Sequence, residues 1–114
     1  MEPLFDIELL PSAVDFLERL DHKTKEKILY NMAKVRVYPD PELFKKLDDH
    51  IWEFRTRYNG MAYRPFSFWD HQKVQPRMVV ATHGIHKKTQ KTPLKEIQKA
   101  NKIRNQYFER NEKS

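Results

Sequence analysis

The 114-residue chain contains no cysteine, only two glycines and no long uninterrupted run of apolar residues. The missing cysteine excludes disulfide-stabilised scaffolds, cysteine-based zinc sites and thiol nucleophiles. A helix needs about 20 apolar residues to cross a bilayer, and no run in this chain approaches that length. Because the amino terminus also lacks the basic segment of a secretory signal, we expect a cytoplasmic protein that does not contact membranes.

Basic residues outnumber acidic ones by 22 to 16, which gives a formal net charge of +6. The excess lies at the end of the chain: residues 1–86 sum to zero, whereas residues 87–114 carry nine basic and three acidic side chains. A basic segment of this kind favours an anionic partner, with nucleic acid as the first candidate. The length is typical of one domain, which we expect to span residues 1–114.

The first part of the chain predicts one strand and two helices. Residues 4–9 alternate as a strand does, and Pro11 is expected to end it. Ser12 is a suitable N-cap for a first helix, whose apolar residues recur at helical spacing as far as Leu20. A second helix is predicted over residues 24–37, with its lysines on a solvated face. The short link between the helices predicts an antiparallel helical hairpin.

The remaining elements form a meander and a last helix. A helical turn is expected near residues 40–44, and Asn59-Gly60 then predicts a tight hairpin, because both positions of a type I′ turn need positive φ. Pro93 is expected to begin the terminal helix. The three strands of the meander are predicted over residues 51–58, 61–69 and 78–85.

Together these elements predict an α+β fold. A small antiparallel sheet, made of the N-terminal strand and a three-stranded meander, should pack against the N-terminal helical hairpin, and a C-terminal helix should follow. Pro65 lies inside the middle strand of the meander, where it cannot donate a hydrogen bond to its neighbour. The sequence therefore requires a bulge or an unpaired position at Pro65.

Three arginines should meet on one side of the meander. Arg55 and Arg57 alternate on its first strand, and Arg64 lies within reach on the second. Guanidinium groups suit a phosphate, because their planar fork matches its geometry and they stay charged. The alternative is that Arg55 and Arg57 form only the solvated face of a half-exposed sheet, with Glu53 as a cross-strand partner.

Histidines and lysines leave the third strand. His83 and His86 are the candidates for proton transfer, because only imidazole titrates near neutral pH without perturbation. We expect no metal or cofactor, since this H-x2-H pair has no carboxylate cluster nearby. Lys87 either supplies charge at the site or belongs to a merely solvated loop. Further candidates for contact with RNA are Lys88, Lys91, Tyr63 and Tyr107, although Tyr107 could equally cap the core.

Three parts of the sequence form a recognisable pattern: IWEFR at 51–55, the Tyr63-Arg64 pair and above all HKKTQKTP at 86–93, followed by Glu96 and Ala100. Through these residues the chain resembles the HigB-like branch of the RelE/ParE toxin superfamily. The resemblance covers nearly the whole chain in element order. Its most specific part is the KKTQKTP stretch.

This resemblance implies the toxin of a type II toxin-antitoxin module. Toxins of this branch are associated with cleaving mRNA in the ribosomal A site, so mRNA and the ribosome are implied partners. A cognate antitoxin, usually with a helix-turn-helix domain, would neutralise the toxin and would alone connect it to operator DNA. Because another branch of the superfamily poisons DNA gyrase, two alternatives stay open: a gyrase inhibitor, or a degenerate toxin that only binds antitoxin or RNA.

Metal-free cleavage of RNA requires a base for the ribose 2′-hydroxyl, charge stabilisation at the phosphorane and a proton for the departing 5′-oxygen. We therefore expect the three arginines to hold the scissile phosphate and His83 or His86 to transfer protons. Lys87 would add charge near the leaving group or anchor the RNA.

Overall fold

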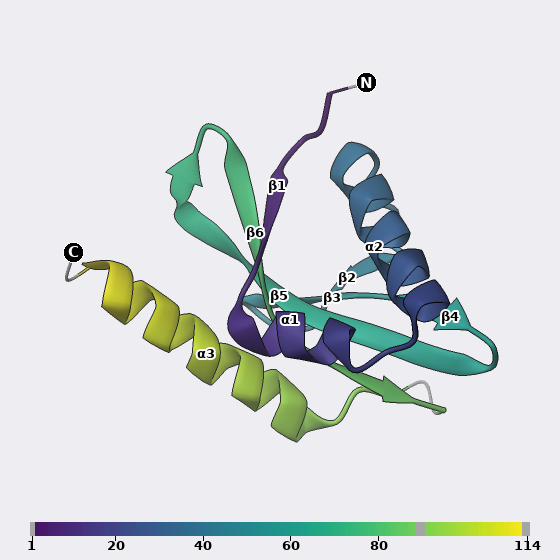
Figure 1. Cartoon of the computed structure of the whole chain (residues 1–114). Coiled ribbons are helices and arrows are strands. Elements are labelled where there is room, and N and C mark those ends of the chain that lie inside the picture. Colours follow the sequence, from purple (N-terminus) through teal and green to yellow (C-terminus); the bar gives the residue numbers. More distant parts are fainter. Residues whose placement is uncertain (1, 89–90, 113–114) are drawn as a thin grey trace.

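The computed structural model describes residues 2–88 and 91–112, which form three helices and one mixed sheet (Figure 1). Thr89 and Gln90, part of the HKKTQKTP stretch, lie outside the described residues. The helices are α1 (Pro11–Glu18), α2 (His22–Val37) and α3 (Leu94–Glu112). The strands are β1 (Asp6–Leu9), β2 (Phe44–Lys46), β3 (Ile51–Phe54), β4 (Thr56–Tyr58), β5 (Met61–Val74) and β6 (Arg77–Lys87).

The sheet has the order β1-β6-β5-β3-β2, and β4 pairs with β5 beside β3. The N-terminal strand β1 is parallel to β6, whereas the other pairs are antiparallel. This arrangement confirms the predicted α+β fold with its three-stranded meander and terminal helix. The prediction that the whole sheet is antiparallel is wrong at β1, which is parallel to β6. The long connection through the helices and the meander allows these two strands to run in the same direction. None of the helices in the described residues combines the length and apolar composition that a membrane-spanning helix needs.

Helices pack on both faces of the sheet and bury a separate apolar cluster on each. Because side chains alternate along β6, Val79 joins the cluster under α1 and α2, whereas Val80 joins the cluster under α3. The first cluster contains Leu17, Ile28, Met32, Val35 and Phe54, and the second contains Ile51, Phe66, Phe68, Ala100 and Phe108.

The starts of both N-terminal helices differ from the prediction. Pro11 does not merely end the strand; it is the first residue of α1, and Leu10 rather than Ser12 is the N-cap. Proline suits this position, because its missing N–H would have no helical partner there. Helix α2 begins at His22, and the Asp21 side chain caps it by accepting from the Thr24 N–H.

Two segments are strands where none was predicted. Residues 44–46 form β2, which pairs with β3, in place of the end of a helical turn. Residues 70–74, which fall between the predicted second and third strands of the meander, continue β5, and the β5–β6 hairpin runs through the whole molecule (Figure 1). Both segments are polar or charged at several positions, so their strand character depends on pairing with a neighbour.

The two predicted backbone features of the meander are confirmed. Asn59 and Gly60 have φ of 51° and 75°, as the tight hairpin requires. At Pro65 the β5–β6 register shifts: Pro65 pairs with Gly84 but Ser67 pairs with Ala81, so β6 carries one extra residue. On its other side Pro65 faces the break between β3 and β4, both of which keep one register with β5. The missing N–H of Pro65 accounts for that break.

We expect Gly84→Ala to destabilise the protein by about 1 to 3 kcal/mol, because the new methyl group would overpack the contact between α1 and β6. A Cβ at Gly84 would lie 2.5 Å from Cδ2 of Phe16. Urea unfolding measures the change. In a Phe16→Ala background the same substitution should cost less, and an equal cost in both backgrounds would contradict this explanation.

Candidate functional site

A groove with a volume of about 750 Å³ lies beside β4. Among the described strands β4 pairs with β5 alone, so its outer edge is open to this groove. The groove is strongly basic. Among the described residues that line it, Glu42 is the one acidic residue. A concave surface lined by one sign of charge concentrates counter-ions. Its cationic residues are Lys27, Lys34, Lys45, Arg55, Arg57 and Arg64.

One wall of the groove belongs to helix α2. Lys27, Asn31 and Lys34 line it, and the Asn31 side chain donates to Thr56 of β4 at 2.9 Å. From the sequence, these lysines were expected on a solvated face, without a connection to the arginines. Their spacing did carry a signal, because residues 27, 31 and 34 share one helix face. What could not be seen was that this face lies opposite β4.

The predicted site residues fall on both faces of the sheet. Tyr63 packs toward the α1 and α2 cluster and stacks on His86, with 6.0 Å between ring centroids. Arg64, the next residue in β5, points to the other face and contacts Thr92, just before α3. By alternation Lys87 lies on the Arg64 face and His86 does not. The predicted residues therefore form two groups on opposite faces of the sheet, with Tyr63 and His86 in one and Arg64 and Lys87 in the other.

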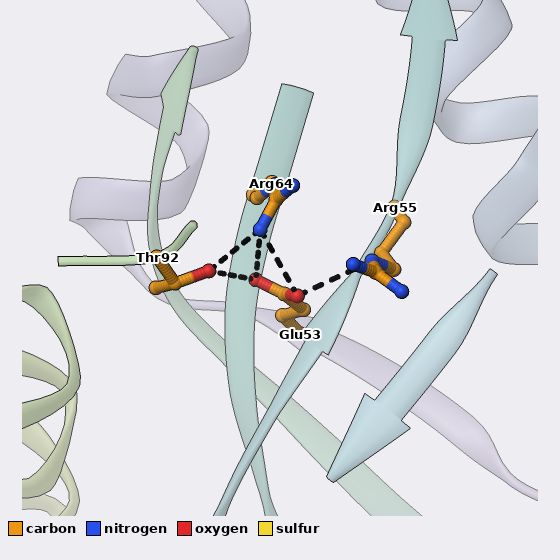
Figure 2. Close-up of polar contacts among 4 residues, drawn as sticks. All are labelled: Glu53, Arg55, Arg64 and Thr92. Carbon is orange, nitrogen blue, oxygen red and sulfur yellow. Dashed lines mark hydrogen bonds and ion pairs between the residues drawn. The ribbon is translucent and has the colours of Figure 1, made fainter. Parts of the chain in front are cut away.

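A buried carboxylate connects two of the predicted arginines (Figure 2). Glu53 is 1% exposed, and its Oε1 and Oε2 lie 3.4 and 3.3 Å from Nη1 of Arg64. Its Oε2 also lies 3.3 Å from Nε of Arg55. Thr92 completes the cluster, because its hydroxyl donates to Glu53 at 2.8 Å and accepts from Arg64 at 2.7 Å. From the sequence, Glu53 was expected only as a cross-strand partner of Arg55 and Arg57 on a solvated sheet face.

The two arginines differ in accessibility. Arg64 is 3% exposed, and its Nε is buried without a hydrogen-bond partner among the residues that the structure describes. The Arg55 side chain is 29% exposed and lines the groove. Arg57 is exposed on β4 and lines the same groove. The charge of Arg64 is therefore directed inward, whereas Arg55 and Arg57 can meet a ligand.

His83 is held in a chain of polar contacts beneath α3. Its Nε2 lies 3.1 Å from Oε1 of Glu96, and its Nδ1 lies 2.9 Å from the Thr82 hydroxyl. His83 lies in the irregular part of β6, where this strand carries one extra residue opposite the region of Pro65. Burial lowers the pKa of His83, although the hydrogen bond that its ring donates to the Glu96 carboxylate opposes this shift. No carboxylate cluster was expected near the histidines, and Glu96, which the sequence indicated only through the family resemblance, reaches His83 from the first turn of α3.

The lowered pKa of His83 predicts a loss of stability in mild acid. Unfolding returns the pKa to 6.5, so below that pH the unfolded chain binds a proton that the folded chain does not. The free energy of unfolding should fall as pH falls from about 6.5 toward the pKa of the folded state. Thermal unfolding between pH 8 and 5 tests this. His83→Gln should flatten the profile, and an unchanged profile would exclude His83 as the cause.

The remaining predicted residues lie away from the groove. Tyr107 donates to Asp70 at 2.6 Å, and burial raises the pKa of its hydroxyl. Asp70 follows Arg64 by six residues in β5, about 20 Å along an extended strand. Tyr107 also packs on Phe68, so it supports the second cluster. Lys88 and Lys91 are exposed on the two sides of the undescribed residues 89–90.

The family model of phage-derived Gp49-like proteins matches residues 15–105 of this chain. The chain belongs to this Gp49-like family. These are RelE/HigB-type toxins. The matched region includes α2, the meander and most of α3, so it contains both walls of the groove and the Glu53 cluster.

The fold of this Gp49-like chain is also similar to that of a solved structure. A chain in the crystal structure of the toxin-antitoxin complex RelBE2 from Mycobacterium tuberculosis aligns with a TM-score of 0.58. The alignment covers 75% of this chain and 100% of that chain, at 16% identity. At that identity the likeness concerns the fold. Comparison with curated proteins finds no match.

Proposed function

We propose that this Gp49-like protein is the toxin of a type II toxin-antitoxin module of the HigB-like branch, and that it is a metal-free endoribonuclease. Its substrate would be mRNA on the ribosome, in the cytoplasm. The observation that carries the proposal is the groove beside β4, which is lined by six lysines and arginines together with Tyr63. Proteins hold single-stranded RNA by this combination of backbone-binding cations and an aromatic surface.

In the proposed reaction Arg55 and Arg57 bind the scissile phosphate and offset the charge that develops on it. His86 takes the proton of the 2′-hydroxyl, and the 2′-oxygen forms its bond to phosphorus. The bond from phosphorus to the 5′-oxygen breaks, and that oxygen takes a proton from solvent in the open groove. The products are a 2′,3′-cyclic phosphate and a 5′-hydroxyl end. Lys87, Lys88 and Lys91 would hold the RNA backbone beyond the site.

His86 is a better candidate for proton transfer than His83. It is exposed and stacks on Tyr63, which lines the groove. His83 is 3% exposed, and both of its nitrogens have partners. We therefore assign His83 a supporting role beneath α3.

The proposed partner is a cognate antitoxin, which the family assignment and the RelBE2 complex both favour. We propose that it carries a helix-turn-helix domain, so that operator DNA meets the toxin only through the antitoxin. Co-expression should suppress the growth arrest that the toxin alone causes. Arrest that continues in the presence of the cognate antitoxin would contradict this assignment.

Primer extension on ribosome-bound mRNA tests the activity. The purified chain should produce discrete stops within codons, and free mRNA under the same conditions is the control for dependence on the ribosome. Loss of DNA supercoiling without such stops would instead identify a gyrase inhibitor. RNA binding without stops would identify a non-catalytic module.

One observation favours the alternative of a non-catalytic module that binds RNA. Among the described residues along the groove there is no histidine, since His83 and His86 line a separate pocket between α1 and β6. A groove of cations without a proton acceptor would bind RNA and leave it intact. His86→Gln distinguishes the two functions, because it should abolish cleavage and leave RNA affinity nearly unchanged if the enzyme proposal is correct.

Binding of RNA in the groove should depend strongly on salt, with a log-log slope of about −0.7 for each phosphate neutralised on a single strand. Fluorescence anisotropy with a 2′-O-methyl oligonucleotide, which cannot be cleaved, measures this slope. The Lys27→Ala/Lys34→Ala double variant should make the slope less negative by up to about 1.4, since it removes two such contacts. Lys23→Ala is the matched control, because Lys23 is an exposed α2 lysine that does not line the groove. A flat salt dependence would indicate that the basic surface docks a protein instead.

A further inference from the structure

We propose that Glu53 is a positioning residue that presents Arg55 to an RNA phosphate, and that Arg64 serves chiefly to hold Glu53. The inference rests on the proposed function and divides the predicted arginines into two roles.

The strand register places Arg55 directly opposite Arg64. Glu53 pairs with Phe66 and Thr56 pairs with Tyr63, so the intervening residues face each other in the same register. Two like charges in that relation repel and destabilise a sheet. Glu53 precedes Arg55 by two residues and shares its face, and its carboxylate lies between the two guanidinium groups (Figure 2). The carboxylate therefore allows both arginines to occupy neighbouring positions.

One carboxylate cannot neutralise two guanidinium groups, so the cluster retains a positive charge. Arg64 cannot offer that charge to a ligand, because it is 3% exposed. Arg55 can, because Glu53 engages only its Nε and the side chain lines the groove. Within the described part of the chain, the terminal nitrogens of Arg55 have no hydrogen-bond partner. A phosphate can accept from both of them at once.

The Glu53 carboxylate is itself held from two sides. Arg64 contacts both of its oxygens, and the Thr92 hydroxyl donates to Oε1 from the segment before α3. The Glu53 carboxylate that orients Arg55 toward the groove is thus held in place by residues of β3, β5 and the segment before α3. Orienting a binding group before the substrate arrives removes part of the entropic cost of reaching the transition state.

A purely structural role for Glu53 makes a different prediction. If Glu53 only stabilised the fold, its substitution would lower activity equally whether or not Arg55 is present. If Glu53 acts through Arg55, its substitution should have little further effect once Arg55 is removed. A double-mutant cycle measures this difference.

The cycle compares Glu53→Gln, Arg55→Ala and the double variant by kcat/KM for cleavage of ribosome-bound mRNA. We expect Glu53→Gln to lower kcat/KM by up to about a hundredfold, and the double variant to match Arg55→Ala alone. In an Arg57→Ala background the effect of Glu53→Gln should remain complete, because Arg57 does not contact Glu53. Losses that multiply in the Arg55→Ala background would overturn the inference.

Thr92→Val provides a second route if Glu53→Gln does not fold. It removes one hydroxyl, leaves every charge in place and should lower kcat/KM by roughly tenfold, but only when Arg55 is present. NMR of the arginine Nε–Hε groups supplies a readout that needs no activity. The Arg55 signal should shift in Thr92→Val and in Glu53→Gln, and an unshifted signal in both would contradict the positioning role.

The failure of this inference differs from the failure of the proposed function. A wild-type chain that binds RNA without cleaving it would contradict the nuclease proposal. The double-mutant cycle of Glu53 and Arg55 would then be measured by the affinity for 2′-O-methyl RNA. A wild-type chain that cleaves mRNA, with Glu53 and Arg55 acting independently, would overturn the inference alone. A chain that neither binds nor cleaves RNA would overturn both.

Discussion

Replacing Arg55 by alanine should lower kcat/KM for mRNA cleavage by about a hundred- to a thousandfold, as expected for the loss of a charged donor at a reacting phosphate. The fold should tolerate this change, because Arg64 and Thr92 still hold the Glu53 carboxylate. Quantitative primer extension on ribosome-bound mRNA measures the rate. Urea unfolding of the same variant should show a loss of at most about 1 kcal/mol, as for a partly exposed ion pair.

Arg77→Ala is the matched control for this experiment. It removes the same charge from the chain, but Arg77 lies near the turn of the β5–β6 hairpin, with its guanidinium 4.3 Å from the Trp69 ring centroid. Its cleavage rate should stay close to that of the unmodified chain. Equal losses in the two variants would mean that overall charge, and not a specific phosphate contact, accounts for the effect of Arg55.

Replacing Arg64 by alanine should instead destabilise the fold by about 3 to 5 kcal/mol, the usual cost of leaving a buried charge without its partner. Glu53 is 1% exposed and would keep only the Thr92 hydroxyl and the Nε of Arg55. Urea unfolding near pH 7 measures the loss. The rate of mRNA cleavage, compared at temperatures where the variant is still folded, should fall less than in Arg55→Ala.

The double variant Glu53→Leu/Arg64→Met provides the control for Arg64. It removes both buried charges and fills their space with apolar atoms, which often recovers stability or raises it. We expect it to be more stable than Arg64→Ala. If Arg64→Ala unfolds at the same urea concentration as the unmodified chain, the buried pair has no structural role and Arg64 returns as a candidate for phosphate contact.

Local chemistry was sufficient to predict most elements of the fold. The apolar periodicity predicted α2, and the need for positive φ predicted the turn at Asn59 and Gly60, because both effects operate over a few neighbouring residues. Pro65 predicted the irregularity in β5 for the same reason. Strand β2 could not be predicted, because its three residues become a strand only by pairing with β3.

The candidate site divides in the same way. Alternation and hairpin pairing were sufficient to predict that Arg55 and Arg64 lie close together, since the register of an antiparallel pair follows from its turn. Neither alternation nor pairing indicates which of the two arginine side chains is buried. The burial of Arg64 with Glu53 involves the segment of Thr92, which contacts them from 28 and 39 residues away along the chain.

By itself, then, the sequence determined most of the elements, their order, the hairpin register and the presence of three neighbouring arginines, because these depend on short-range geometry. Only the tertiary structure decided that α2 forms a basic wall opposite β4, that Glu53 is buried and that Arg64 faces inward while Arg55 faces the groove. The physical reason is that burial and charge compensation depend on which distant segments pack against a side chain.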